Sequence, residues 1–255
     1  MTDTTTGSLT GKVALVTGGA RGLGLEISRQ LAALGAHVIV GTRDHAKAEA
    51  VVADLRGQGH EASALKLDVT SQQDREKAGA AIEKAHGKLD ILINNAGILL
   101  DSRDGGTPAA RQPSEALPSV LRETFEANFF APIFLTQFLL PLIRRAPAGR
   151  VVNVSSIRGS LAHLSDPTSP VYPVRALGYD TSKAALNAFT ILIAEELRGT
   201  PIKINAIHPG WLRTEMGGAQ ADMGVEEGAR IAVKYATLDA TGPTGGFFFD
   251  ERLPW

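Results

Sequence analysis

Seven short runs rich in β-branched and other apolar residues recur along the chain and alternate with helix-length amphipathic stretches. The runs cover residues 12–17, 36–42, 62–69, 89–97, 149–156, 202–210 and 245–249. Stretches between them, such as GLGLEISRQLAALG, carry apolar residues at helical spacing. Several runs are apolar almost throughout, which is typical of parallel strands covered by helices on both faces. The pattern predicts an α/β fold of the Rossmann type, a doubly wound sheet of about seven mainly parallel strands with helices on both faces.

The composition limits what such a chain can bind. The formal net charge is −1, so no global field attracts nucleic acid or an anionic membrane. There is no cysteine, which excludes disulfides and thiolate catalysis and fits a cytoplasmic location. The six histidines lack ligand spacing, so no metal site is expected. We therefore expect a small-molecule partner.

One domain accounts for most of the chain. Residues 1–10 have no basic residue and no apolar run, which predicts a disordered tail rather than a signal peptide or anchor. Residues 11–255 then form a single domain, and no later run reaches the roughly 18 consecutive apolar residues of a spanning helix. Two segments, 98–118 and 157–177, are rich in Gly, Pro, Ser and Asp and are predicted to be loops. Both follow strands, where open α/β sheets bind ligands, so we place them at the substrate mouth.

A glycine-rich turn, within VTGGARGLGLEI (16–27), joins the first strand to the first helix. Gly18, Gly22 and Gly24 leave no Cβ where a diphosphate would approach the backbone, and the helix start offers free amides. The position inside the first βαβ unit favours dinucleotide binding. The alternative is a tight turn that binds nothing.

The end of the second strand bears on which dinucleotide is bound. An NAD site places an acid there to hold the ribose 2′-hydroxyl, but this strand ends in Gly41, Thr42 and Arg43. Arg43, with Arg21 as a second donor, suits a 2′-phosphate, which favours NADP(H) over NAD(H). In the alternative interpretation Arg43 is solvated and Asp44 neutralises it.

Further motifs occur in a fixed order along the chain. They are TGGARGLG (17–24), Asp68-Val69, NNAG (94–97), Asn128, NVSS (153–156), Tyr179-x-x-x-Lys183 and HPGWLRT (208–214). On these residues the chain resembles the short-chain dehydrogenase/reductase family over nearly its whole length. The GTRD end of the second strand and the closing GPTGGFFFDERLPW look most like NADPH-dependent carbonyl reductases.

The resemblance implies a cofactor site. Asp68 and Val69 would lie against the adenine, and the turn 94–97 would border the cofactor. Thr214 and nearby backbone would bind the nicotinamide carboxamide. The full set implied for the cofactor is Gly18, Arg21, Gly22, Leu23, Gly24, Arg43, Asp68, Val69, Asn95, Ala96, Gly97, Tyr179, Lys183, Pro209, Gly210, Leu212 and Thr214.

The resemblance also implies catalytic roles for Ser156, Tyr179, Lys183 and Asn128. Residues at i and i+4 share a helix face, so the Lys183 ammonium can lie near the Tyr179 phenol, and we expect it to lower the pKa of that phenol. Ser156 would hydrogen-bond the substrate oxygen, with Ser155 as the competing candidate. Asn128 would hold a water of a proton relay; the alternative is a buried amide that satisfies backbone groups.

The activity implied is NADPH-dependent reduction of a ketone or aldehyde, run reversibly. A hydroxysteroid or polyol dehydrogenase and a 3-oxoacyl reductase remain open, the last because Arg103, Arg111, Arg158 and Arg175 offer a basic entrance. A dinucleotide-sensing protein without turnover is the non-enzymatic alternative.

The surroundings of the site are less constrained by the sequence. Gly217, Gly218 and Gly224 and the lack of an apolar stripe predict a mobile lid over 211–232. His163 and Trp211 are candidate substrate contacts. The long Ser156 to Tyr179 spacing leaves both a homo-oligomer and a monomer open, and Trp255 with 247–249 is expected to pack at a subunit surface or the sheet edge.

Overall fold

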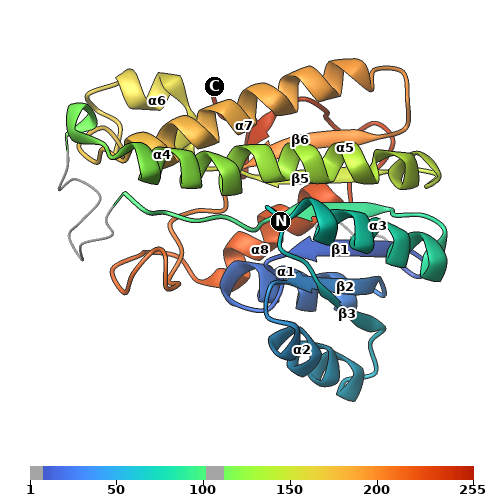
Figure 1. Cartoon of the computed structure of the whole chain (residues 1–255). Coiled ribbons are helices and arrows are strands. Elements are labelled where there is room, and N and C mark those ends of the chain that lie inside the picture. Colours follow the sequence, from blue (N-terminus) through green and yellow to red (C-terminus); the bar gives the residue numbers. More distant parts are fainter. Residues whose placement is uncertain (1–7, 102–111) are drawn as a thin grey trace.

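The computed structural model describes residues 8–101 and 112–255, and one seven-stranded sheet forms its centre (Figure 1). The strand order is β3-β2-β1-β4-β5-β6-β7, and each neighbouring pair runs parallel. The strands are β1 (Val13–Thr17), β2 (His37–Thr42), β3 (Ala62–Lys66), β4 (Ile91–Asn94), β5 (Arg150–Val154), β6 (Lys203–Ile207) and β7 (Phe247–Phe248). The predicted fold class is confirmed, and each of the seven predicted runs contains one strand.

Helices cover both faces of the sheet. One layer contains α1 (Gly22–Ala33), α2 (His45–Gly57) and α8 (Val225–Ala236), and the other contains α3 (Gln72–His86), α5 (Ala131–Arg144) and α7 (Leu177–Glu196). The shorter elements are α4 (Pro118–Phe125), α6 (Leu161–Ser165), the 3-10 turns η2 (Pro113–Glu115) and η4 (Ile157–Gly159), and the π-helical turn η3 (Glu126–Phe130). The fold is thus a three-layer sandwich.

Alternation along each strand divides the core between these layers. In β1, Val13 and Leu15 pack with α3, α5 and α7, whereas Ala14 and Val16 pack with α1, α2 and α8. Both faces of the strand are therefore dry, and burying a side chain such as Leu15 contributes about 2 kcal/mol. This explains why the strand runs are apolar throughout rather than alternating.

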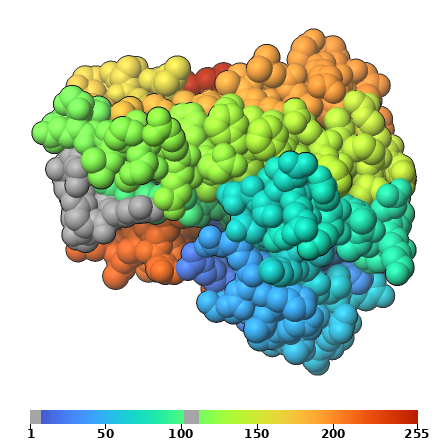
Figure 2. All heavy atoms as spheres, viewed as in Figure 1, coloured from blue at the N-terminus to red at the C-terminus, as the bar shows by residue number. Residues whose placement is uncertain are grey.

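The longest apolar helical segment runs through α4, η3 and α5, from Pro118 to Arg144, and crosses the front of the molecule in Figure 2. Its 27 residues include a window with mean hydropathy 1.4, long and apolar enough to cross a membrane by length and composition. Counting uninterrupted apolar residues missed this segment, because Thr136 and Gln137 break the run. Half of the window is buried, and Leu135, Leu139 and Ile143 pack against the sheet, as in a core helix of an α/β domain.

The outer side of α5, together with the last residue of η3, exposes aromatic rings. Phe130, Phe134 and Phe138 recur every four residues and are 39–44% exposed. The rings of Phe130 and Phe134 stack with centroids 6.0 Å apart. This exposed face is compatible with a monomer and with a homo-oligomer, so both stay predictions.

The predicted disordered tail extends too far along the chain. Residues 1–7 lie outside the described part, but Leu9 is only 8% exposed and its N–H donates to Leu34 O at 2.8 Å. Leu9 belongs to the core beside α1. The ordered domain therefore begins before residue 11.

The predicted lid also extends too far. Residues 225–232 lie in α8, whose Ala229, Ile231 and Ala232 are buried in the core that α8 shares with α1. The glycine-based argument overlooked the apolar face of this helix, in which three alanines, Ile231, Val233 and Tyr235 are buried. Residues 208–224 connect β6 to α8, so of the predicted lid only 211–224 lies in the connection, and that part remains the predicted lid.

The two predicted loops differ in their outcome. Within 157–177 the structure contains η4 and α6, so this segment is not a plain loop. Of 98–118, residues 102–111 lie outside the described part, and the rest is irregular apart from η2 and the first residue of α4. At the far sheet edge, β7 confirms the edge placement of 247–249: Phe247 is fully buried and stacks on Trp255 with centroids 5.8 Å apart.

Candidate active site

The glycine turn and the NNAG turn meet at the carboxyl ends of β1 and β4, two neighbouring parallel strands. Thr17, the last residue of β1, joins them: its hydroxyl donates to Ile93 O at 3.1 Å and accepts the N–H groups of Asn95 and Ala96, each at 3.0 Å. Asn95 Nδ2 donates back to Thr17 O at 2.8 Å. Strand β4 ends at Asn94 because these backbone groups bond to Thr17 instead of to the sheet. Sequence reasoning did not assign Thr17 a role, although a polar residue closing an apolar run was the available signal.

The glycines of the turn are required by close packing. A Cβ on Gly24 would overlap Gly18 O and lie 2.5 Å from Asn95 Nδ2, and Gly18 has a φ of +64°. Gly22 faces Thr214, whose Cγ2 lies 3.5 Å from the position of a Cβ. Arg21, the residue before α1, makes no side-chain cap, so the first amides of α1 point into this space without a side-chain acceptor. The cradle fits the diphosphate of a dinucleotide, with Thr214 at its edge.

The two arginines predicted for a 2′-phosphate differ in their surroundings. Arg43 is exposed after β2, and Asp44, instead of neutralising it, caps α2 by accepting the Lys47 N–H at 3.3 Å and pairs with Lys47 Nζ at 3.5 Å. Arg21 forms an exposed ion pair with Glu215. Such exposed pairs are worth less than about 1 kcal/mol, so a phosphate can displace Glu215. Arg43 is thus the better placed cation.

The residues predicted to border the adenine form a turn after β3. Asp68 Oδ1 accepts from the Thr70 N–H at 3.0 Å and from its hydroxyl at 2.7 Å. Val69 O accepts from Arg75 Nη1 at 2.7 Å. The Leu67 N–H just before them donates to Thr42 O at 2.9 Å, so the turn begins beside the end of β2, where Arg43 follows in the chain.

Ser156 and Tyr179 come together at the end of β5. Ser156 is 7% exposed, and its hydroxyl accepts the Arg158 N–H at 3.2 Å. The hydroxyl is also close enough to the Tyr179 phenol to lower the pKa of that phenol. The adjacent Ser155 faces the other way and donates to Asn187 Oδ1 at 2.6 Å. The structure therefore brings Ser156, and not Ser155, to the tyrosine.

Lys183 lies one turn below Tyr179 on α7 and is 4% exposed. Its Nζ donates to Val154 O, at the end of β5, at 2.8 Å and lies 5.6 Å from the Tyr179 ring centroid. Burial lowers the pKa of Lys183 to about 8. The ammonium is held against the strand end, close to Gly97.

The expected direction of the Tyr179 shift is wrong for the protein without ligand. Burial raises the pKa of Tyr179 above its ordinary value, and the groups that oppose this are first the Arg158 guanidinium and then the Ser156 hydroxyl. Desolvation of the phenolate outweighs the nearby charges. Lys183, held by Val154 O, is not the cation that acts most on the phenol.

Asn128 lies in the π-helical turn η3 and is fully buried. Its Oδ1 accepts the Ile98 N–H at 2.8 Å, and its Nδ2 donates to Ile98 O at 2.9 Å and to Ser182 Oγ at 3.1 Å. The side chain thus satisfies the backbone after β4, which is the alternative considered above. A relay water would have to bind its backbone carbonyl, near a turn whose hydrogen bonds are already shifted to i+5.

Three charged residues next to the catalytic motifs were not predicted as site residues. Arg158 Nε donates to Asp180 Oδ1 at 2.7 Å, and Arg158 Cζ lies 5.8 Å from the Tyr179 ring centroid. Asp101 accepts the N–H groups of Gly178 and Tyr179 at 2.9 and 3.1 Å, which caps α7 from a distant segment. Their proximity to Tyr179 in the fold, and not their spacing, identifies them.

The two predicted substrate contacts, His163 and Trp211, come from different segments of the chain. His163, in α6, makes a 3.3 Å hydrogen bond to Ser169 through Nδ1, and its buried Nε2 has no partner among the described residues. Trp211 is 53% exposed and donates to Gly217 O at 2.9 Å. Both stay predictions as substrate contacts.

The predicted basic entrance loses support. Arg158 pairs with Asp180, and Arg175 lies over the Tyr172 ring, 4.4 Å from its centroid. The other two members, Arg103 and Arg111, lie outside the described residues. Two of the four cations are therefore engaged within the protein.

The segment after β6 is closely packed beside the glycine turn. Gly210 has a φ of +95°, and Leu212 is 6% exposed with its carbonyl accepting the Thr214 N–H at 2.8 Å. His208 precedes Pro209, and burial lowers its pKa to about 4. In the part of the chain that the structure describes, no cluster of three or more His, Cys, Asp or Glu side chains is arranged to hold a metal.

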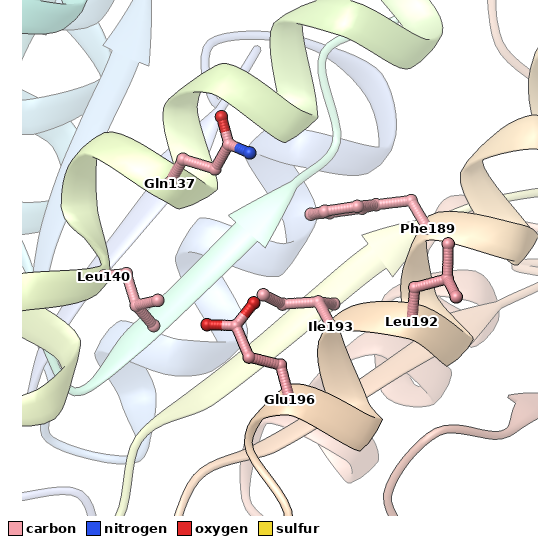
Figure 3. A pocket seen from close by; sticks show the side chains of 6 residues that line it. All are labelled: Gln137, Leu140, Phe189, Leu192, Ile193 and Glu196. Carbon is pink, nitrogen blue, oxygen red and sulfur yellow. The ribbon is translucent and has the colours of Figure 1, made fainter.

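A surface hollow of about 370 Å³ lies elsewhere, between α5 and α7 (Figure 3). Gln137, Leu140, Phe189, Leu192, Ile193 and Glu196 line it. None of these is a predicted site residue, and the helices that bear them cover the sheet face. The hollow is thus separate from the Ser156 and Tyr179 site.

A doubly wound sheet with a glycine cradle, a buried serine and lysine, and a tyrosine beside them defines a class, the α/β oxidoreductases. The family model described as short chain dehydrogenase matches residues 12–224. Carbonyl reductase 1 (NADPH) of Homo sapiens is 32% identical, over 94% of this chain and 97% of its own. Salutaridine reductase of Papaver somniferum is 31% identical, over 94% of each chain. The structure of NADPH-bound carbonyl reductase from chicken fatty liver has a TM-score of 0.82 at 28% identity, over 96% of this chain and 99% of that one. The chain belongs to the short-chain dehydrogenase family.

Proposed function

We propose that this short-chain dehydrogenase is an NADPH-dependent reductase that converts a ketone or aldehyde to an alcohol, reversibly. The observation that carries the proposal is the arrangement of Tyr179 with the buried Ser156 and Lys183 at the end of β5, beside the glycine cradle. Relatives named as NADPH carbonyl reductases over nearly the whole chain support the carbonyl subtype.

The protein's own residues would hold the cofactor in a defined order. The amides at the start of α1 face the diphosphate, Arg43 the 2′-phosphate, and Thr214 the carboxamide end. The absence of a carboxylate at Thr42 supports NADPH over NADH. When bound, NADPH supplies the hydride to the carbonyl carbon.

The chain's residues handle the substrate oxygen and its proton. Ser156 donates a hydrogen bond to the carbonyl oxygen and orients it against Tyr179. The Tyr179 phenol gives its proton to that oxygen as the alcohol forms, and the phenolate takes the proton back in the reverse direction. Lys183, fixed by Val154 O, places its positive charge below Tyr179 and would face the ribose of a bound cofactor.

The test is a fluorescence titration of the wild type and Arg43→Ala with NADPH and NADH, followed by a screen of ketones and aldehydes. The proposal expects a clear NADPH preference in the wild type. In Arg43→Ala we expect NADPH affinity to fall about 10- to 100-fold, because a charged hydrogen bond contributes about 1.5–3 kcal/mol, while NADH affinity stays unchanged. Lys47→Ala, on the same surface of α2, is the matched control. Equal affinities in the wild type, or a preference for NADH, would contradict the Arg43 assignment and redirect the search to alcohol oxidation.

A further inference from the structure

A buried ion pair lies directly beside the tyrosine of the site. The side chains of Arg158, on η4, and Asp180, on α7, are 16% and 7% exposed, and their Nε and Oδ1 atoms are 2.7 Å apart. Arg158 Cζ lies 5.8 Å from the Tyr179 ring centroid. Burying such a pair is costly, so stability alone is a weak reason for its presence.

The guanidinium of Arg158 is not fully satisfied. Its Nε donates to Asp180, but Nη2 is shielded from solvent and has no partner among the described residues. An unpaired buried donor costs about 1–3 kcal/mol, and such groups call for an explanation beyond packing. The unpaired N–H group belongs to the guanidinium that lies over the Tyr179 ring.

The turn that bears Arg158 is held rigidly against α7. A Cβ on Gly159 would lie 2.7 Å from Lys183 C, so only glycine allows η4 to approach the helix this closely. Gly159 O accepts from Asn187 Nδ2 at 3.2 Å, and the Arg158 N–H donates to Ser156 Oγ at 3.2 Å. The distance between the guanidinium and Tyr179 is therefore fixed by the same contacts that place Ser156.

The charges around Tyr179 come from three elements. Arg158 approaches from η4, Asp180 and Lys183 from α7 itself, and Asp101 from the segment after β4, where it accepts the Tyr179 N–H. Arg122 and Glu123 of α4, which also packs on α7, are exposed. Burial raises the pKa of Tyr179, Arg158 is the largest opposing influence, and Asp180 adds to the rise.

We propose that Arg158 is a positioning residue that stabilises the phenolate of Tyr179, with Asp180 holding the guanidinium in place. The inference rests on the proposed function, in which Tyr179 transfers the proton. Arg158 acts through its positive charge and does not itself transfer the proton. Its charge favours the phenolate that accepts the alcohol proton and is left after the phenol has protonated the carbonyl oxygen.

The test reads Tyr179 directly and does not need a substrate. The chain has three tyrosines, so tyrosine labelled with ¹³C at Cζ gives three resonances, assigned with Tyr179→Phe. Each is titrated with pH in the free protein and with saturating oxidised dinucleotide, whose positive ring lowers the midpoint. Arg158→Gln should raise the Tyr179 midpoint by about one pH unit. Arg158→Lys, which keeps the charge, should largely restore it, and Asp180→Asn should lower it.

A matched control is built into the chain. Arg175 lies over Tyr172 as Arg158 lies over Tyr179, and Arg175→Gln should move the Tyr172 resonance while leaving Tyr179 unchanged. A Tyr179 midpoint that stays at the wild-type value in both Arg158→Gln and Asp180→Asn would overturn the proposal. If Arg158→Gln does not fold, the two other single variants decide. The Tyr179 midpoint should fall in Asp180→Asn and stay near the wild-type value in Arg158→Lys, and an unchanged midpoint in Asp180→Asn would overturn the proposal.

Kinetics separate this inference from the proposed function. In alcohol oxidation kcat/KM rises with pH as Tyr179 ionises, so Arg158→Gln should move that rise to higher pH and Asp180→Asn to lower pH. Shifted resonances without turnover of any carbonyl or alcohol would support Arg158 and refute the reductase. If both variants turn over substrate and the rise of kcat/KM with pH stays where it is in the wild type, the reductase is supported and the role of Arg158 is refuted.

Discussion

The two ends of the sheet treat buried polar groups differently. At the amino end, Asp90 accepts from the Val13 N–H at 3.0 Å and pairs with Lys12 and Lys88 at 3.2 and 2.8 Å. Arg150, which begins β5, is 4% exposed and donates to four backbone carbonyls. These acceptors belong to Gly149, Pro201, Leu238 and Asp239. Both charges are thus compensated within the chain.

At the carboxyl end, buried polar atoms lack partners among the described residues. Four such atoms lie at or after strand ends: Asn94 Oδ1, Arg158 Nη2, His163 Nε2 and His208 Nδ1. The same fold therefore satisfies its polar groups where only stability is at stake and leaves them unsatisfied where a ligand is expected. Changes at the amino end should alter stability, and changes at the carboxyl end should alter chemistry.

Tyr179→Phe should have the largest effect on turnover. Removing a general acid typically costs about 10²- to 10⁴-fold in rate, and the ring that packs against Arg158 is retained. We expect kcat to fall by that factor in steady-state assays, while NADPH affinity by fluorescence and the free energy of unfolding stay close to wild type. Retained turnover in this variant would favour a dinucleotide sensor or another proton donor.

Arg150→Met should give the largest loss of stability. Removing the guanidinium leaves several buried carbonyls unsatisfied, and we expect the free energy of unfolding to drop by about 3 kcal/mol in urea. Specific activity per folded molecule should not change. Arg145→Met, which loses an exposed pair with Glu83, is the control and should change stability by less than about 1 kcal/mol. A kcat effect of Arg150→Met at full folding would break the comparison between the two ends.

His208 should make stability depend on pH. Burial lowers its pKa to about 4, whereas in the unfolded chain it titrates near its ordinary 6.5. Between these values the unfolded state binds the extra proton, so this contribution to stability falls as the pH falls from about 6.5 to about 4. The loss is about 2 kcal/mol, reduced from the full shift because His208 is only partly shielded from solvent.

The check is urea unfolding at a series of pH values for the wild type, His208→Asn and His45→Asn. His208→Asn should flatten the dependence in this window. His45 is exposed beside Glu49, so the His45→Asn curve should follow the wild type. A wild-type slope that persists in His208→Asn would assign the effect to other groups.

The sequence was informative where local pattern and burial agree. Strand runs apolar on both faces predicted the sheet, and alternation separated Ser156 from Ser155, which the structure turns toward Asn187. The direction of the Tyr179 shift was not predictable, because it depends on how much solvent the folded chain removes. Sequence reasoning assigned Arg158 only to a basic entrance and assigned Asp101 no role, since their contacts to α7 join residues 22 to 78 positions apart. Helix α8 was missed because its small apolar residues were judged as a glycine-rich lid.

Asp101→Ala should have the smallest effect on stability and turnover of the variants considered, the controls aside. It is the sharpest test of the difference between the two ends of the sheet. The residue before α7, Ala176, has no capping side chain, so Asp101 supplies the acceptor for the Gly178 and Tyr179 N–H groups. Losing a cap costs about 1 kcal/mol of stability. Because the lost bond is to Tyr179 itself, we also expect a several-fold drop in kcat. Ser71→Ala removes the cap of α3, far from Tyr179, and should cost similar stability with no change in kcat.

Unfolding and steady-state kinetics on the Asp101→Ala and Ser71→Ala variants separate the two contributions. If both lose stability and only Asp101→Ala loses turnover, the cap serves the placement of the tyrosine as well as the helix. If neither loses turnover, α7 holds Tyr179 through Ser156, Gly159 and the Arg158 pair alone. The segment after β4 would then affect only the stability of the protein, as the buried charges at the amino end of the sheet do.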